Sequence, residues 1–163
     1  MIIRIAQEQD MPALLHIYNY EVLHGLATFD LHAKTMQERM PWFYEHNRDN
    51  HPLLVAEMDK RAVGYASLSP YRDKEAYART VELSVYVDPD YRRRGIARRL
   101  MAAILDQARL RDDIHTVISV ITDGNTASVV LHEEFGFNYC GTIKEVGWKF
   151  GKLLGIVNYQ LMV

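Results

Sequence analysis

The sequence contains a single cysteine, Cys140, among its 163 residues, so no disulfide can form within the chain. Secreted domains are often rich in disulfides, whereas the cytoplasm is reducing, and we therefore expect a cytoplasmic protein. Long apolar runs are also missing. The opening segment "MIIRIAQEQDM" reaches a charged residue at Arg4, which predicts neither a signal peptide nor a membrane span.

Neither sign of charge is in large excess. The 19 Lys and Arg residues are balanced by 21 Asp and Glu residues, for a formal net charge of −2 at pH 7. A nucleic-acid partner bound through a broad basic surface is therefore not indicated, and any anion site must be local. The chain has no repeat, low-complexity segment or recognisable linker, and its length suits one folded unit. We predict a single domain over residues 1–163.

The first half of the chain carries clear local signals. A short alternating segment at residues 2–6 predicts a strand, and Asp10 is a candidate N-cap for the apolar helical stripe that follows. Thr35 and Glu38 form a T-x-x-E capping box at a second helix start. Two β-rich segments separated by Asp59 and Lys60 predict a hairpin.

The second half alternates strands with helices. The strand "YARTVELSVYV" is followed by the helical pattern "ARRLMAAILDQARL", the strand "HTVISVIT", the helix "NTASVVLHEEF" and two closing strands. This order predicts an α+β or α/β domain whose central sheet contains a β-α-β-α-β run. In such sheets ligands bind beyond the carboxyl ends of the strands, where helix N-termini point inward.

One of these strand-to-helix turns is strongly basic. The segment "DPDYRRRGIARRL", residues 88–100, places five arginines around Gly95. Gly95 allows an unusual backbone conformation and a close approach of a ligand, and the helix that begins there offers unpaired N–H groups. A solvated basic face is the alternative interpretation, but this placement favours a phosphate cradle. We expect it to comprise Arg92, Arg93, Arg94, Gly95, Ile96, Ala97 and Arg98.

The spacing Arg92-x-x-Gly95-x-Ala97 resembles the (Q/R)-x-x-G-x-(G/A) motif with which the GNAT acetyltransferase superfamily binds the pyrophosphate of acetyl-CoA. "SVYV" resembles the strand that pairs with the pantetheine arm, and "NTASVVLHEEFGF" a later segment beside the cofactor. Within the superfamily the chain resembles the phosphinothricin and methionine sulfoximine N-acetyltransferase branch, through "IYNYEVL", "AYARTVELSVYV", "LHEEFGF" and "GWKFGKLLGIVNYQL" in matching order.

This resemblance implies a fold, an activity and a cofactor. The fold would be a mixed, mostly antiparallel sheet flanked by helices in α/β/α layers. The activity would be direct transfer of an acetyl group from acetyl-CoA to the α-amino group of a small amino acid or analogue, within a ternary complex and without a metal. Proteins of the branch are commonly homodimers. The cofactor residues implied outside the basic turn are Val85, Tyr86, Val87, Asn125 and Ser128.

Two residues are predicted to act in catalysis. Glu82 interrupts an apolar alternation and so lies on the opposite strand face to its neighbours, where a carboxylate is costly unless it is paired or functional. An ordinary ion pair is the alternative, but the resemblance implies a general base that acts through water. His132 replaces a Tyr common in the superfamily and is implied to support this relay, against the alternative of a structural histidine. Cys140 is expected to be a small buried thiol rather than an acetylated nucleophile.

The resemblance also implies a substrate loop in "SPYRDKEAYART". Its cations Arg72, Lys74 and Arg79 are candidates for the substrate carboxylate, with Tyr77 as a wall and Phe29 as a second wall. Here the chain departs from much of the branch, because Ala78 follows Tyr77 where an arginine is common, so Arg79 would face the other side of the strand. Three alternatives remain open: an acyl-CoA sensor without catalysis, another small amine or a protein amine as acceptor, and a nucleic-acid module.

Overall fold

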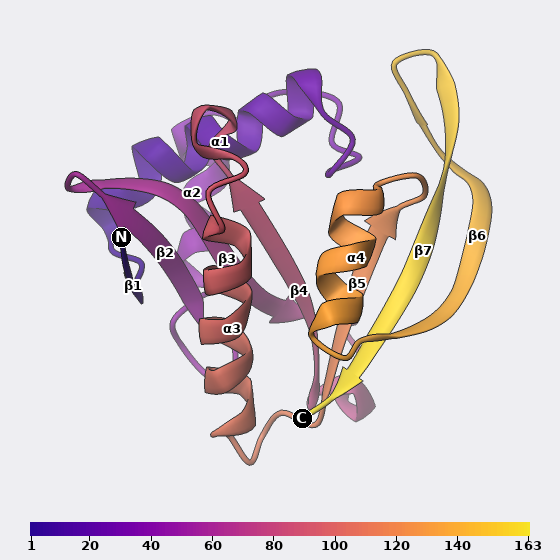
Figure 1. The fold of residues 1–163 in the computed structure, drawn as a ribbon. Helices are drawn as coiled ribbons and strands as arrows, with labels where there is room; N and C mark the ends of the chain where they lie inside the picture. The colour runs from indigo at the N-terminus through magenta and orange to yellow at the C-terminus, as the bar shows by residue number, and fades with distance from the viewer.

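The structure is a computed structural model that describes residues 1–163, and it joins every strand into one sheet (Figure 1). The elements in chain order are β1 (Ile2–Ile5), α1 (Met11–His24), α2 (Met36–Tyr44), β2 (Leu53–Met58), β3 (Arg61–Pro70), β4 (Thr80–Val87), α3 (Ile96–Arg109), β5 (Thr116–Thr122), α4 (Thr126–Glu134), β6 (Asn138–Lys149) and β7 (Lys152–Met162). Short 3-10 turns precede α1, β4 and α3.

The sheet has seven strands in the order β1-β2-β3-β4-β5-β7-β6. Every neighbouring pair is antiparallel except β4 and β5, which confirms the predicted mixed, mostly antiparallel sheet. The predicted hairpin is confirmed as well, because Asp59 and Lys60 turn between β2 and β3 with φ of 49° and 62°. The β-α-β-α-β order also holds along the chain, although β7 lies between β5 and β6.

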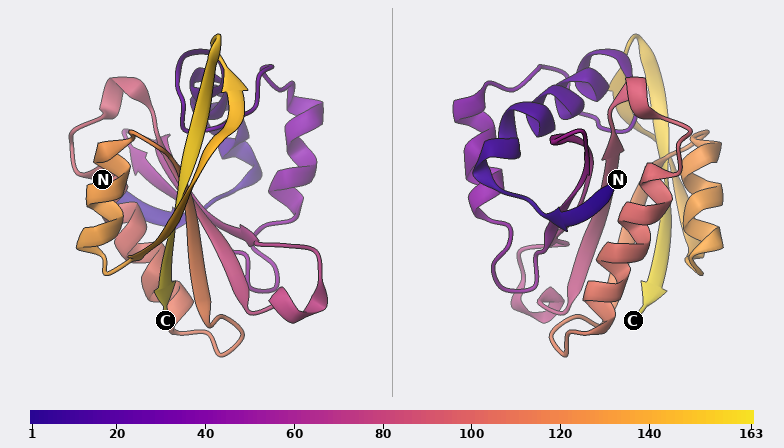
Figure 2. Two further views of the ribbon diagram at one scale, coloured as in Figure 1. Left: turned by 90° about the vertical axis from the view of Figure 1, so that its right-hand side faces the viewer. Right: turned by 60° about the vertical axis from the view of Figure 1, so that its left-hand side comes forward.

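The helices cover the two faces of the sheet in pairs, as both views of Figure 2 show. The larger core lies under α3 and α4, where Leu100 and Ile104 meet Leu68 and Val117. A smaller core lies under α1 and α2. Successive side chains of β3 point to opposite faces of the sheet, so Ala66 and Leu68 face α3 whereas Tyr65 faces α1 and α2. This alternation explains why the protein has two separate cores. The predicted α/β/α layering is therefore confirmed.

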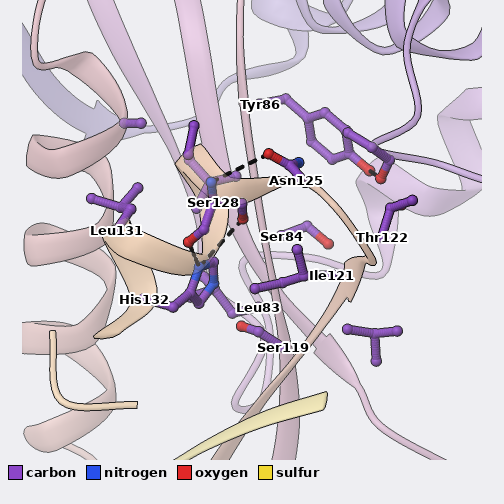
Figure 3. A pocket seen from close by; sticks show the side chains of 15 residues that line it. Leu83, Ser84, Tyr86, Ser119, Ile121, Thr122, Asn125, Ser128, Leu131 and His132 are labelled. Carbon is purple, nitrogen blue, oxygen red and sulfur yellow. Dashed lines mark hydrogen bonds between the residues drawn. The ribbon is translucent and has the colours of Figure 1, made fainter. Parts of the chain in front are cut away.

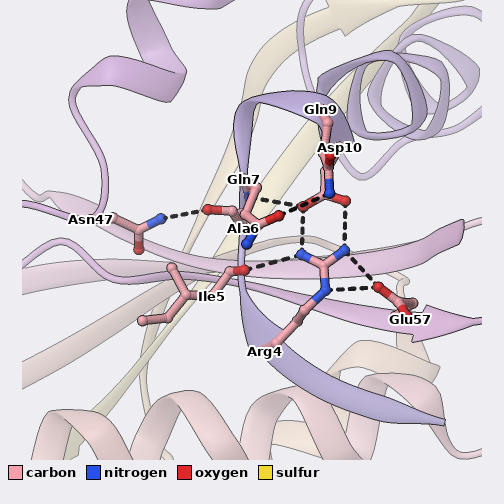
Figure 4. Close-up of polar contacts among 8 residues, drawn as sticks. All are labelled: Arg4, Ile5, Ala6, Gln7, Gln9, Asp10, Asn47 and Glu57. Atoms are coloured by element: carbon pink, nitrogen blue, oxygen red, sulfur yellow. Dashed lines mark hydrogen bonds and ion pairs between the residues drawn. The ribbon is translucent and has the colours of Figure 1, made fainter. Parts of the chain in front are cut away.

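The segment before α1 is held by Arg4 (Figure 4). Its guanidinium donates to both carboxylate oxygens of Asp10, at 2.7 and 2.8 Å, and to Glu57 of β2 at 2.7 Å. Asp10 occupies the predicted N-cap position of α1, but its carboxylate accepts from Arg4 and from the Gln7 N–H rather than capping that helix. The capping box of Thr35 and Glu38 is formed as predicted.

The two parallel strands separate partway along their length. Residues 80–82 of β4 pair with residues 116–118 of β5, and beyond Glu82 the pairing stops while both strands continue. The backbone groups of Leu83–Val87 that face away from β3 therefore have no strand partner. A hydrogen-bonding edge opens in the middle of the sheet, which positions the site described below.

The prediction for Cys140 was wrong, because this residue is exposed. It lies at an irregularity between Tyr139 and Gly141 on β6, the edge strand of the sheet, where no layer covers the side chain. It lies outside the cavities described below. None of the helices has both the length and the apolar character needed to traverse a bilayer.

Candidate active site

A continuous groove runs from the gap between β4 and β5 to the N-terminus of α3. It consists of three adjoining cavities of about 220, 640 and 510 Å³, which share wall residues such as Val85, Ala97 and Asn125. Figure 3 shows the innermost part, which is lined by side chains from β4, β5 and α4. The groove therefore lies where the sheet has lost its pairing.

The outer end of the groove lies against the basic turn. Gly95 is the residue before α3 and has a φ of 74°, in the left-handed region that favours glycine. No side chain caps α3, whereas the Asn125 side chain accepts from the Ser128 N–H at the start of α4. A β-carbon added at Gly95 would meet no atom within 4 Å. The first turn of α3 thus presents open N–H groups to the groove, as an anion site requires.

The arginines of the turn are not equivalent. Arg92 and Arg98 line the groove while ion-paired to Glu21 of α1 and Glu134 of α4, respectively. Arg93 lines it without an ion pair, and its φ is 59°. Arg94 turns away, lies over the Tyr91 ring and donates to the Asp90 carbonyl. Of the predicted cradle residues, all but Arg94 line the groove: Arg92, Arg93, Gly95, Ile96, Ala97 and Arg98.

The inner end is narrow and carries unsatisfied polar groups. The predicted residues Val85, Tyr86, Asn125 and Ser128 all line it, and Val87 lines the outer part. The Ser119 hydroxyl of β5 is buried there without a hydrogen-bond partner. Together with the unpaired edge of β4, it suits a long ligand that carries amide groups. The residues present therefore fit the pantetheine arm and pyrophosphate of acetyl-CoA.

Glu82 lies at the last pair of the parallel ladder, opposite Ser69 of β3. Its carboxylate has neither an ion pair nor a hydrogen bond to the protein, and burial raises its pKa above the ordinary range of a glutamate. The alternative of an ordinary ion pair is thus not what the structure contains. A half-buried carboxylate of raised pKa and without a partner has the character of a general base.

His132 lines the inner groove from α4, on the other face of the sheet from Glu82. Its Nδ1–H donates to the Ser128 carbonyl at 2.7 Å, because a carbonyl can only accept, and so Nε2 carries the lone pair. Burial lowers the pKa of His132, which favours this neutral form. No hydrogen bond joins His132 to Glu82. The imidazole can accept a proton or a water, but from the opposite side of β4.

Residues 26–28, which follow α1, close the groove. Three side chains hold this segment by donating hydrogen bonds to its three consecutive main-chain carbonyls. The Thr122 hydroxyl of β5 donates to the carbonyl of residue 26, and the Tyr86 hydroxyl of β4 to that of residue 27 at 3.3 Å. Lys149 of β6 donates to the carbonyls of Thr28, at 2.8 Å, and Glu21. Burial lowers the pKa of Lys149. Three strands thus fix the wall of the groove.

The predicted substrate residues lie outside the cavities. Arg72 is exposed and lies 5.1 and 5.7 Å from the rings of Tyr71 and Tyr77. Lys74 is also exposed and unpaired, in the same loop. Arg79 donates to the carbonyl of Asp112 at 2.8 Å, toward the loop before β5.

The second predicted wall, Phe29, lies elsewhere. Its ring packs against Gly147 of β6, which has no room for a side chain. The structure thus brings together Arg72, Lys74 and Tyr77 but not Arg79 or Phe29.

A separate, fourth cavity of about 160 Å³, which we call the chamber, lies between the sheet and the pair α1 and α2. It shares Ser84 and Tyr86 with the groove. Arg39 of α2 and the serines of β3 at positions 67 and 69 also line it, and none of these three was predicted as a site residue. Alternating serines in the strand pattern "YASLS" were the one available signal, since polar positions in a buried strand need a purpose.

Comparison with known proteins identifies this arrangement. The model of the "Acetyltransferase (GNAT) family" matches residues 17–137. A phosphinothricin N-acetyltransferase from Streptomyces coelicolor is 39% identical over 161 residues, which covers 97% of this chain and 94% of that protein. An L-methionine sulfoximine/L-methionine sulfone acetyltransferase from Salmonella typhimurium is 34% identical over 163 residues, which covers 100% of this chain and 95% of the relative.

Solved structures agree with this assignment. A crystal structure named ribosomal-protein-alanine N-acetyltransferase, from Brucella melitensis, superposes with a TM-score of 0.96 at 43% identity and covers 100% of both chains. Acetyl-CoA is the acyl donor of the family, and a Salmonella relative was solved with it bound. The groove, its uncapped helix N-terminus and these matches lead to one conclusion: the chain is an acyltransferase that belongs to the GNAT acetyltransferase family.

Proposed function

We propose that the enzyme acetylates the α-amino group of small amino acids or their analogues, of the phosphinothricin and methionine sulfoximine type, by direct transfer in a ternary complex. The observation that carries this proposal is the half-buried, unpartnered carboxylate of Glu82, which lies two residues before Ser84, a residue that lines both the groove and the chamber. Bound acetyl-CoA supplies the acetyl group as a thioester. The chain itself must deprotonate the amine, hold it in line and keep water away.

Each of these tasks has a candidate group. Glu82 takes the proton of the ammonium through a water molecule, because an α-ammonium is mostly protonated near pH 7 and cannot attack. Arg72 and Lys74 are free cations on the loop before β4 and would hold the carboxylate of the acceptor. The unpaired N–H groups near Leu83 and Val85 would polarise the carbonyl that is attacked.

A protein amine is the competing acceptor, and the name of the Brucella structure points to one. A peptide has an amide where a free amino acid has its carboxylate, so it would leave the cations Arg72 and Lys74 without an anionic partner. A free amino acid therefore fits this geometry better. A sensor without catalysis is disfavoured because Glu82 and His132 are both retained in the site.

An acceptor screen with acetyl-CoA tests the proposal directly. Release of free CoA should be fast with methionine sulfone, methionine sulfoximine or phosphinothricin. It should be at least about tenfold slower with a peptide that begins with alanine, because the peptide lacks the carboxylate that Arg72 and Lys74 would hold. A preference for the peptide would contradict the proposal and assign a protein acceptor instead. Equal, negligible rates with all amines would support the sensor.

The proposal includes a homodimer, formed through the hairpin of β6 and β7. Large apolar side chains are exposed along this hairpin, which projects beyond the rest of the sheet in Figure 1, among them Ile143, Val146, Trp148, Phe150 and Leu153. A long apolar edge strand is an aggregation hazard unless a partner covers it. We propose a second copy of the chain as the occupant, because it would bring the same apolar edge to a symmetric interface.

Light scattering on Leu153→Lys tests this interface. We expect the wild type to have twice the mass of the chain and the variant to have the mass of one chain, since a lysine would be buried unpaired in the interface. Leu110→Lys is the matched control, because Leu110 is 86% exposed at the end of α3. A monomeric wild type would disprove the dimer. The single cysteine and the use of acetyl-CoA support a cytoplasmic location as part of the same proposal.

A further inference from the structure

One wall of the chamber is formed by Arg39, whose positive charge has no ion-pair partner in the protein. The Arg39 guanidinium lies between two aromatic rings, 4.0 Å from the centre of Tyr18 and 3.8 Å from that of Trp42. It forms no ion pair, and its nearest polar neighbour in the protein is the Tyr65 hydroxyl, whose pKa it lowers. Stacking fixes the position of the cation but leaves its N–H donors free, so Arg39 is preorganised to bind an oxygen acceptor.

The floor of the chamber supplies a second free donor. The Tyr65 hydroxyl is fully buried and has no hydrogen-bond partner, although it lines a polar cavity. A buried polar group without a partner is costly, and a ligand oxygen would satisfy it. Burial raises the pKa of Tyr65, and the neighbouring Arg39 guanidinium offsets only part of this rise, so that the phenol keeps its proton and can donate.

Three serines of the sheet line the chamber, and only one of their hydroxyls takes part in a hydrogen bond within the protein. The His46 Nδ1–H donates to the carbonyl of Trp42 at 2.6 Å, so the Ser69 hydroxyl donates to Nε2 at 2.9 Å. Ser67 and Ser84 have no hydrogen-bond partner. The chamber thus offers a guanidinium, a phenol and two hydroxyls to a group that carries several oxygens.

The chamber is also correctly placed for an acceptor. Ser84 and Tyr86 form a wall common to the chamber and the groove, and Glu82 lies two residues before Ser84 on the same strand face, roughly 7 Å along the strand. The loop that carries Arg72 and Lys74 precedes β4, and so it lies beyond the Glu82 end of these β4 residues. An acceptor with its amine at Glu82 therefore has the loop cations on one side and the chamber on the other.

We infer that the chamber is the subsite for the side-chain end of the acceptor, where Arg39 and Tyr65 select a compact oxygen-bearing group such as a phosphinate or a sulfone. This inference rests on the proposed function, since it requires an amino acid at Glu82. Within the proposed substrate class, it predicts that Arg39 and Tyr65 make amino acids whose side chains end in a small, strongly hydrogen-bonding group better substrates than apolar ones of the same length.

Two variants test the inference without unfolding the protein. Tyr65→Phe removes a hydroxyl that has no partner, and Arg39→Gln removes the charge. For phosphinothricin and methionine sulfone, Arg39→Gln should lower kcat/KM by about 10- to 100-fold, chiefly through KM, and Tyr65→Phe by about 3- to 10-fold. The kcat/KM for methionine should change less than about threefold in both, and so should the Kd for acetyl-CoA. Arg48→Gln, at an exposed and unpaired arginine, is the matched control.

Trp42 gives a readout that does not depend on turnover. In a Trp148→Phe background it is the sole tryptophan, so its fluorescence reports binding in the chamber. Phosphinothricin should change the emission, and Arg39→Gln should abolish that change. Equal losses for methionine and phosphinothricin, or an unchanged Arg39→Gln variant, would overturn the inference. A wild type that binds phosphinothricin at Trp42 but acetylates no amino acid would contradict the proposed function and not the subsite.

Discussion

Replacing Glu82 with glutamine should lower kcat by about 10²- to 10⁴-fold while leaving the affinity for acetyl-CoA unchanged. The substitution keeps the shape of the side chain and removes only its ability to accept a proton. Because the carboxylate has no partner in the fold, we expect no loss of folding stability. Steady-state kinetics, calorimetry with acetyl-CoA and thermal unfolding measure the three quantities.

The pH profile separates a base from a merely structural carboxylate. A base acts when deprotonated, and burial raises the pKa of Glu82, so kcat should fall as the pH drops through a value above the usual glutamate range. That acidic limb should be absent in Glu82→Gln. Glu45→Gln, at an exposed glutamate of the α2 end, should keep both the rate and the limb. Wild-type turnover by Glu82→Gln would remove Glu82 from the mechanism.

Replacing Gly95 with valine should weaken the binding of acetyl-CoA by roughly 10- to 100-fold, the equivalent of one lost charge-assisted hydrogen bond. The new side chain would project into the open space at the N-terminus of α3, where the N–H groups await a phosphate. The backbone would be strained as well, by about 1–2 kcal/mol, because φ is 74°. Calorimetry with acetyl-CoA measures the affinity directly.

Gly151→Val separates the two effects. Gly151 turns between β6 and β7 with a φ of 72°, and its position is equally open, but it lines none of the cavities of the groove. We expect both variants to lose similar thermal stability, while only Gly95→Val loses affinity. If the two variants bind acetyl-CoA equally well, the phosphate does not approach Gly95.

The features that the sequence revealed were those with local causes. The capping box at Thr35 and the hairpin turn at Asp59 each depend on a few neighbouring residues, and both formed as predicted. Gly95 could be assigned because a glycine between a strand and a helix has few structural roles. The face of Glu82 followed from strand alternation alone, since its neighbours Val81 and Leu83 are buried on the opposite side.

The features that escaped prediction depend on contacts between distant segments. Arg39 enters the site only because α2 packs over β3, and Arg92 finds Glu21 across 71 positions of sequence. Asp10 offered a capping carboxylate, but the guanidinium of Arg4 competes for it and wins. Cys140 was expected inside because cysteines usually are, whereas the sheet order that leaves β6 at an edge cannot be read from composition.

The three carbonyls that hold the segment after α1 have a consequence for how the enzyme can change. Thr122, Tyr86 and Lys149 all bind main-chain oxygens at positions 26–28, and a main-chain oxygen is present whatever the side chain. The segment can therefore accept new side chains without losing its anchorage, whereas its three donors cannot be exchanged so freely. Side chains at positions 26–28 can therefore vary, during evolution or in a mutant library, and change the acceptor preference while the backbone of the segment stays in place.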